Sequence, residues 1–338
     1  MDTPEQIEAH PNWPRVLSFI AITYAIDWGA VGALYAGGVQ IKGLVASAVA
    51  TGYMIVPALV VLVLAWRWGV ALKDYGVRVP RRWELALAPV VPIVIAMLTV
   101  IAAVAMGLGE LDVTGMALAD RLTEMGQAEA AEAVRAGFER TPLNPILLTI
   151  LSAPIAGFTI NGLFAFGEEL GWRGLLQREL APMGFARASA LIGVVWGVWH
   201  APLILLGHNF PQHPRLGVLV MTVACVPLGI VLSWLALRAQ TVFAAAAAHG
   251  TLNAVSGVTM MAVRGGDSIE IFILGYAGIV AAALVAGPML GRPPTDAIYG
   301  PEAPPAPPAV EGPPPPPPGG STDIGPAGPH RPPGGDED

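Results

Sequence analysis

The chain has 338 residues, of which 54% are hydrophobic and only 13% are charged, and its mean hydropathy is +0.59. Soluble globular domains carry about 25% charged residues, so this composition excludes an ordinary soluble protein and indicates a membrane protein. The formal net charge is −7, and the chain has no basic block suited to nucleic acid. Its single cysteine, Cys225, lies in an apolar run, where we expect a small hydrophobic filler facing lipid or another helix.

Eight apolar segments are long enough to cross a bilayer, which takes about 20 residues of α-helix. Pro154 and the polar Asn161 interrupt the fourth of them. The sequence therefore predicts an all-α fold, a polytopic transmembrane helical bundle of about eight spans, within a membrane domain at residues 1–290. The predicted spans cover residues 15–37, 44–66, 85–108, 144–177, 187–206, 216–237, 241–263 and 269–290.

Lysine and arginine in the short loops predict the orientation, because cytoplasmic loops are enriched in these residues. The loop after the second span and the loop after the fourth are the richest, and the loops that alternate with them are poorer. We therefore expect a multi-pass protein of the plasma membrane with both termini in the cytoplasm. The basic residues that carry this prediction are Arg67, Lys73, Arg78, Arg81, Arg82, Arg173, Arg178 and Arg187.

Two segments outside the spans have distinct compositions. Residues 109–142 are rich in alanine and glutamate with apolar residues at roughly helical spacing, so we expect either an external helix that lies on the membrane surface or caps the bundle, or a plain solvated connector. Residues 291–338 are rich in proline and glycine. Such a segment cannot bury a core, and it predicts a disordered cytoplasmic tail with polyproline II character.

Three stretches place polar side chains inside apolar runs, where each ionisable group costs about 2.5 to 3.5 kcal/mol and usually marks function. In the first stretch, Glu169 and Arg173 are four residues apart and share a helix face, so we expect them to pair. Glu168 is rotated by about 100° from its neighbour. It is therefore the freer carboxylate and the better candidate for a general base.

The other two stretches bring polar residues to a similar depth. His200 in the fifth span, with His249 and Asn253 in the seventh, lies roughly 12 to 20 Å from the cytoplasmic ends of the helices, and Glu168 lies at about 14 Å. Each residue alone is more often a helix–helix hydrogen-bonding group or part of an ion pair. Their common depth predicts one intramembrane pocket. Asp27, in the first span, is unpaired by sequence and is a weaker candidate for this pocket.

The three stretches resemble the motifs of the CAAX prenyl protease and bacteriocin-processing (CPBP) family, the Rce1-like or Abi intramembrane proteases. The resemblance covers about residues 145–263, and it implies a helical bundle with a conical cavity open toward the cytoplasm. Trp196 stands where the family more often has phenylalanine, which we interpret as a conservative change. The motifs are Glu168-Glu169-x-x-x-Arg173, Trp196-x-x-x-His200 and His249-x-x-x-Asn253.

The resemblance also implies a role for each motif residue. Glu168 and His200 would activate a water molecule, and Glu169 and Arg173 would support the arrangement. His249 and Asn253 would stabilise the oxyanion of peptide hydrolysis. Two histidines and a carboxylate are also an acceptable zinc set. Glu168, His200 and His249 are therefore the metal ligands if a metal is used, and the sequence leaves a metal-free mechanism equally open.

These observations predict an intramembrane endopeptidase that hydrolyses a peptide bond in a membrane-associated protein or a peptide precursor within the lipid bilayer. One alternative is a non-proteolytic membrane scaffold in bacteriocin immunity or in the regulation of another membrane protein. A small-solute transporter could use the same polar pocket. The lack of internal repeats disfavours a transporter, because many transporters are built from related halves.

Overall fold

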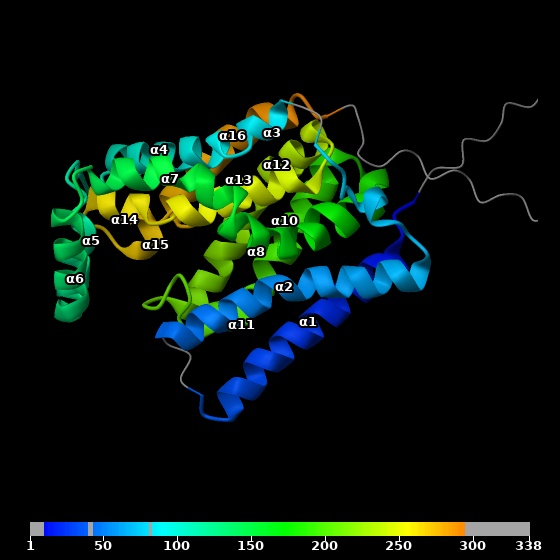
Figure 1. Cartoon of the computed structure of the whole chain (residues 1–338), viewed down its shortest axis with the longest axis horizontal. Helices are drawn as coiled ribbons and strands as arrows, with labels where there is room; N and C mark the ends of the chain where they lie inside the picture. The colour runs from blue at the N-terminus through cyan, green and yellow to red at the C-terminus, as the bar shows by residue number, and fades with distance from the viewer. Residues whose placement is uncertain (1–9, 40–42, 81–82, 295–338) are drawn as a thin grey trace, which may run out of the picture. The chain divides into compact units, whose positions relative to one another are not determined.

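The computed structural model describes residues 10–39, 43–80 and 83–294, so the predicted tail lies almost entirely outside the described residues. Within them nearly every element is a helix, which confirms the all-α prediction (Figure 1). The exception is a pair of two-residue strands, β1 and β2, joined in antiparallel register. The elements are α1 (Trp13–Ala36), α2 (Gly43–Trp68), the 3₁₀ turn η1 (Leu72–Tyr75), α3 (Glu84–Leu87), α4 (Val90–Ala105), β1 (Glu110–Leu111), α5 (Ala117–Glu124), α6 (Ala128–Glu139), α7 (Pro145–Phe158), α8 (Ile160–Glu169), the π-helix η2 (Leu170–Leu176), α9 (Gln177–Glu179), the 3₁₀ turn η3 (Ala181–Met183), α10 (Phe185–Trp199), α11 (Ala201–Leu205), α12 (Pro214–Ala239), α13 (Val242–Val255), α14 (Val258–Ala262), β2 (Val263–Arg264), α15 (Ser268–Ile271) and α16 (Tyr276–Leu290).

Helices occupy all eight predicted spans, but not all of them are long enough to cross a membrane. In the described part of the chain, five helices qualify by length and composition, and six if the bent pair α7–α8 counts as one crossing. Helices α10 and α13 have 15 and 14 residues and rise only about 22 Å, against a hydrocarbon core of about 30 Å. The polytopic bundle is thus confirmed, whereas the expected eight spans exceed the number of full-length crossings.

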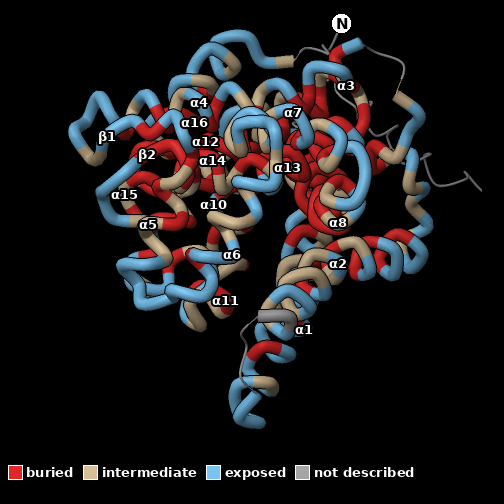
Figure 2. Tube along the Cα trace, turned by 60° about the vertical axis from the view of Figure 1, so that its left-hand side comes forward, coloured by how far each residue is buried: buried red, intermediate tan, exposed pale blue. Residues whose placement is uncertain are grey.

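Helix α13 forms the centre of the bundle and packs against α4, α7, α8 and α12. It is buried along most of its length, whereas α1 is largely exposed (Figure 2). Close approach depends on glycine: a Cβ on Gly250 of α13 would lie 2.6 Å from the backbone nitrogen of Gly162 in α8. Small residues allow this kind of close backbone contact between membrane helices. The alanine-rich sequence of α13 therefore serves to bring the neighbouring helices close to the site.

The same kind of contact joins α10 to α12. A Cβ on Gly193 would lie 2.5 Å from the carbonyl oxygen of Cys225, and one on Gly197 would lie 2.5 Å from the Cα of Thr222. These two glycines are one helical turn apart and form a groove for the facing helix. The groove fixes α10, which carries the second motif.

The predicted fourth span is bent by 55° between α7 and α8. The break falls at Thr159, whose backbone angles (φ −122°, ψ −114°) are not helical. The side chain of Asn161 donates a hydrogen bond to the carbonyl oxygen of Gly250 at 3.2 Å, which explains this polar residue within an apolar run. Pro154 lies inside α7 and does not end it. The bend directs α8 toward α2 and α13 and delivers the first motif to the bundle interior.

The segment 109–142 is helical, as predicted, and its helix α5 packs against α14 and β2 (Figure 1, left). Arg121 holds it there by donating hydrogen bonds to the carbonyl oxygens of Val263 (2.9 Å), Gly265 and Gly266 (2.8 Å). Arg264 pairs with Asp112 at 2.8 Å across the same junction. These contacts favour a cap on the bundle over a plain connector.

Candidate active site

Glu169 forms the buried ionic centre of the site. Its Oε1 accepts hydrogen bonds from Arg173 Nη1 at 2.9 Å and from His249 Nδ1 at 2.8 Å. The pair with Arg173 has the four-residue spacing that the sequence predicted, and both side chains are fully buried. The contact with His249 crosses from η2 and α8 to α13, so the first and third motifs are joined directly. An ionised carboxylate only accepts, so Nδ1 of His249 carries the proton and Nε2 is left for other partners.

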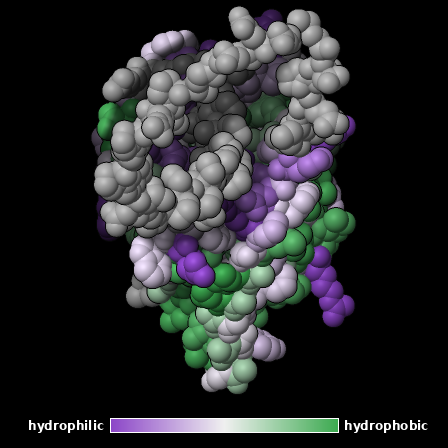
Figure 3. Space-filling view, turned by 90° about the vertical axis from the view of Figure 1, so that its right-hand side faces the viewer, coloured by the Kyte–Doolittle hydropathy of each residue, from purple (hydrophilic) through white to green (hydrophobic). Residues whose placement is uncertain are grey.

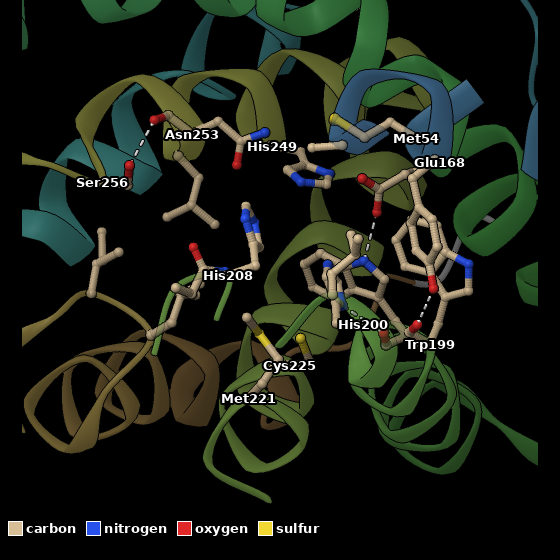
Figure 4. A pocket seen from close by; sticks show the side chains of 18 of the residues that line it. Met54, Glu168, Trp199, His200, His208, Met221, Cys225, His249, Asn253 and Ser256 are labelled. Atoms are coloured by element: carbon tan, nitrogen blue, oxygen red, sulfur yellow. Dashed lines mark hydrogen bonds between the residues drawn. The ribbon is translucent and has the colours of Figure 1, made fainter. Parts of the chain in front are cut away.

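Glu168 projects from the end of α8 into a different environment. It lines a cavity (Figure 4). Its Oε2 accepts hydrogen bonds from Trp196 Nε1 at 2.7 Å and from Trp172 Nε1 at 3.4 Å. None of the described residues hydrogen-bonds the other oxygen, Oε1. The predicted division between the two glutamates is therefore present in the structure. Glu168 is not free, however, because two indoles fix one of its oxygens.

His200 follows the last residue of α10 and is oriented by its own helix. Its Nδ1 lies 2.8 Å from the carbonyl oxygen of Trp196, and the rings of Trp196 and Trp199 pack edge-on against the imidazole. A carbonyl oxygen can only accept, so Nδ1 of His200 is the donor and Nε2 remains available. Both histidines thus have the Nδ1 proton fixed by a backbone or carboxylate oxygen.

The cavity has a volume of about 260 Å³. Four predicted residues, Glu168, His200, His249 and Asn253, line it, as their common depth predicted (Figure 4). Glu169 and Arg173 are absent from its lining and lie behind it. The other lining residues are Ala50, Tyr53, Met54, Trp196, Trp199, Leu203, His208, Asn209, Met221, Cys225, Leu252, Ser256, Phe272, Ile273 and Leu274.

Two of the other lining residues, Cys225 and His208, had no predicted place in the pocket. Cys225 lines the cavity where α12 contacts α10, so the expectation of a filler facing only lipid or another helix was incomplete. His208, to which the sequence assigned no role, points into the cavity beside Asn253 (Figure 4). It lies in the loop between α11 and α12, and no motif spacing in the sequence connects it with the other site residues.

The predicted metal set does not assemble in this structure. Among the described residues, no three His, Cys, Asp or Glu side chains lie close enough together to hold one metal ion. One oxygen of Glu168 is also engaged by Trp196 and Trp172. Glu168, His200 and His249 therefore do not fit a zinc site as they stand.

Side chains from α1 and α2 hold the end of α10. Trp199 donates from Nε1 to Oδ2 of Asp27 at 2.7 Å, and its carbonyl oxygen accepts from Tyr53 (2.6 Å) and from Trp28 (3.1 Å). Asp27 is thus paired, and it lies behind the site residue His200. Sequence reasoning identified Asp27 as unusual, but its partner is 172 residues away and no spacing rule connects them.

A polytopic helical bundle that directs a buried carboxylate and two imidazoles into one cavity is typical of an intramembrane hydrolase. Comparison with known proteins supports this class. Residues 142–255 match the family described as Type II CAAX prenyl endopeptidase Rce1-like. This match supports the resemblance to the Rce1-like (CPBP) family that the three motifs predicted, and the matched region contains all six motif residues.

One similar protein is CAAX prenyl protease 2 from Methanococcus maripaludis, which is 29% identical over 168 residues. The match covers 41% of this chain and 60% of that protein, so the chain spans less than two thirds of the curated relative. Helices α1 and α2, which contribute Asp27, Trp28 and Tyr53, precede the family match.

Proposed function

We propose that this protein is an intramembrane endopeptidase of the CAAX protease type, which hydrolyses a peptide bond in a protein or peptide at the membrane. The observation that carries the proposal is the cavity lined by Glu168, His200 and His249, in which no described residue is hydrogen-bonded to Nε2 of either histidine. A carboxylate and an imidazole that face one small space can activate a water molecule between them.

In this proposal, Glu168 takes a proton from water as the water oxygen attacks the peptide carbonyl carbon. Its Oε2 is fixed by Trp196, so Oε1 is the oxygen that receives the proton. His200 orients the same water by accepting its second proton in a hydrogen bond at Nε2. When the tetrahedral intermediate collapses, Glu168 returns the proton to the departing amine nitrogen. The reaction then consumes one water per bond, and no covalent enzyme intermediate forms.

His249 and Asn253 stabilise the oxyanion in this scheme. For Nε2 of His249 to donate, the imidazole must carry protons on both nitrogens, and its positive charge needs compensation in an apolar interior. Glu169 supplies it through the 2.8 Å contact with Nδ1. Arg173 is the second partner of the same carboxylate oxygen. The carboxylate of Glu169 thereby supports a charged donor that faces the cavity.

The proposal can be tested by comparing the peptides and membrane proteins of cells that carry the wild-type chain with those of cells that carry Glu168→Gln. Proteolysis predicts one or more truncated species that disappear in the variant while the protein is still made. Glu129→Gln, on the exposed face of α6, is the matched control and should leave the pattern unchanged. A phenotype that depends on the chain but is fully retained by Glu168→Gln would favour the non-proteolytic scaffold instead.

A further inference from the structure

We infer that Asp27, in α1, is a positioning residue of the proposed active site, and that it holds the end of α10 so that the imidazole of His200 faces the cavity. The role of His200 in catalysis rests on the proposed function, whereas the anchoring of α10 does not. The inference makes α1 and α2, which precede the family match, a working part of the site.

Helix α10 ends inside the bundle, where its last carbonyl groups need partners. The last four carbonyl oxygens of an α-helix have no donor within the helix, and the apolar part of a bilayer offers no water in place of one. The following helix, α11, does not supply every donor, because Pro202 near its start has no backbone N–H. Trp199, the last residue of α10, is buried. The turn directly before His200 therefore depends on donors from other helices.

Helices α1 and α2 supply these donors. The carbonyl oxygen of Trp199 accepts from the hydroxyl of Tyr53 at 2.6 Å and from Trp28 Nε1 at 3.1 Å, which uses both of its acceptor positions. One turn earlier, the carbonyl oxygen of Val195 accepts from the hydroxyl of Tyr24. Three side chains from two helices thus bind two carbonyl groups of α10 and fix the position of its end.

Asp27 fixes the side chain that lies between this anchor and the site. Its Oδ2 accepts from Nε1 of Trp199 at 2.7 Å, and the ring of Tyr53 packs on the same indole with the ring centroids 4.3 Å apart. The indole of Trp199 in turn packs edge-on against the imidazole of His200, at a centroid distance of 4.9 Å. If the indole rotated, the imidazole would lose the surface that it packs against. Asp27 therefore acts on the direction of His200 Nε2 through Trp199.

The place of Asp27 in the helix also indicates a specific use. It is the only acidic residue of α1, and it is 1% exposed. Other faces of the helix carry exposed apolar side chains, such as Leu17, Ile22 and Ile26. Hydrophobic residues accordingly cover the lower part of the face shown in Figure 3, where Figure 1 places α1. An acidic side chain among apolar helices is costly and usually functional, and the bond to Trp199 gives this one its function.

A double-mutant cycle on Asp27 and Trp199 tests the inference in the full-length protein, with cleavage of an identified substrate in liposomes as the assay. Asp27→Leu is similar in size to aspartate but has no acceptor. We expect it to lower kcat by about 10- to 100-fold, because small displacements of a catalytic group are that costly, and to change KM by less than about twofold. Asp27→Asn keeps an oxygen that can accept from the indole, so it should retain most of the wild-type kcat.

Trp199→Phe removes the donor of the same hydrogen bond and should also lower kcat. Adding Asp27→Leu to it should cause no further loss, because residues that act through one contact are not additive. Ile26→Ala, on the exposed face of α1, is the matched control and should leave kcat and KM unchanged.

Amide hydrogen exchange reports the anchor without a proteolytic assay. It is measured by mass spectrometry on the full-length variants in detergent. Residues 196–205 should exchange faster in Asp27→Leu than in the wild type, whereas α13 should exchange at the wild-type rate. If Asp27→Leu does not fold, Trp28→Phe takes its place. It removes only the donor at 3.1 Å and should give the same change to a smaller degree.

A wild-type kcat in Asp27→Leu would overturn the inference, and so would additive losses in the cycle or unchanged exchange at residues 196–205. Equal losses in Asp27→Asn and Asp27→Leu would also overturn it, because the charge and not the hydrogen bond would then matter. The proposed function fails separately. Faster exchange together with processing that Glu168→Gln leaves unchanged would reject proteolysis and keep the anchor. Unchanged exchange together with processing that Glu168→Gln abolishes would keep proteolysis and reject the anchor.

Discussion

Replacing Trp196 with phenylalanine removes the strongest hydrogen bond to Glu168 while keeping an aromatic ring next to His249. The indole Nε1 lies 2.7 Å from the carboxylate. Hydrogen bonds to charged groups contribute roughly 1.5 to 3 kcal/mol. A factor of ten in rate corresponds to about 1.4 kcal/mol, so we expect a loss of about 10- to 100-fold in kcat/KM for Trp196→Phe. The substitution that the sequence suggested to be conservative is therefore expected to be costly.

The assay is cleavage of an identified substrate by the purified protein in liposomes. Trp172→Phe is the matched control: its indole lies 3.4 Å from the same oxygen and should contribute less. Activity of Trp196→Phe within twofold of wild type would refute this role of the indole.

Three further predictions concern stability, measured as thermal unfolding in detergent. Glu169→Gln removes the carboxylate that pairs with the buried guanidinium of Arg173, and the loss should be about 3 to 5 kcal/mol; unchanged unfolding would show that the pair does not hold the site together. Gly250→Leu forces a side chain into the α8 backbone and should unfold the bundle or lower its Tm by several degrees or more, whereas Gly137→Leu, on the exposed face of α6, should cost less because the added side chain meets open space. Burial raises the pKa of Asp112, but hydrogen bonds from Thr114 and Arg264 lower it overall. Its stabilising contribution is therefore complete above about pH 3.9 and lost as the pH falls below that value. Asp112→Asn should remove this part of the acid dependence, and an identical pH profile in the variant would contradict the assignment.

Local spacing predicted those parts of the site that lie on one helix. Glu169 and Arg173 pair because residues four apart share a face, and His249 and Asn253 reach the same cavity for the same reason. The bond between Glu169 and His249 joins residues 80 positions apart. A common depth indicated that the two helices meet, but it could not specify which glutamate the histidine contacts.

Tertiary packing accounts for most of the differences between expectation and structure. The apolar pattern continues through the ends of α10 and α13, but α10 stops at Trp199, where side chains from α1 and α2 bind its final carbonyl. These contacts come from segments more than 140 residues earlier, which no local pattern predicts. His208 was likewise missed because its place in the cavity depends on how the loop before α12 folds back.

The central claim is that Glu168 activates water for peptide hydrolysis. It is tested most directly by the single-turnover cleavage rate of a substrate in liposomes, with wild-type protein compared with Glu168→Gln and with the surface control Glu129→Gln. General base catalysis contributes about 10²- to 10⁴-fold, so the account predicts a loss of at least about 100-fold for Glu168→Gln and a wild-type rate for Glu129→Gln. A correctly folded Glu168→Gln protein that cleaves at the wild-type rate would contradict it.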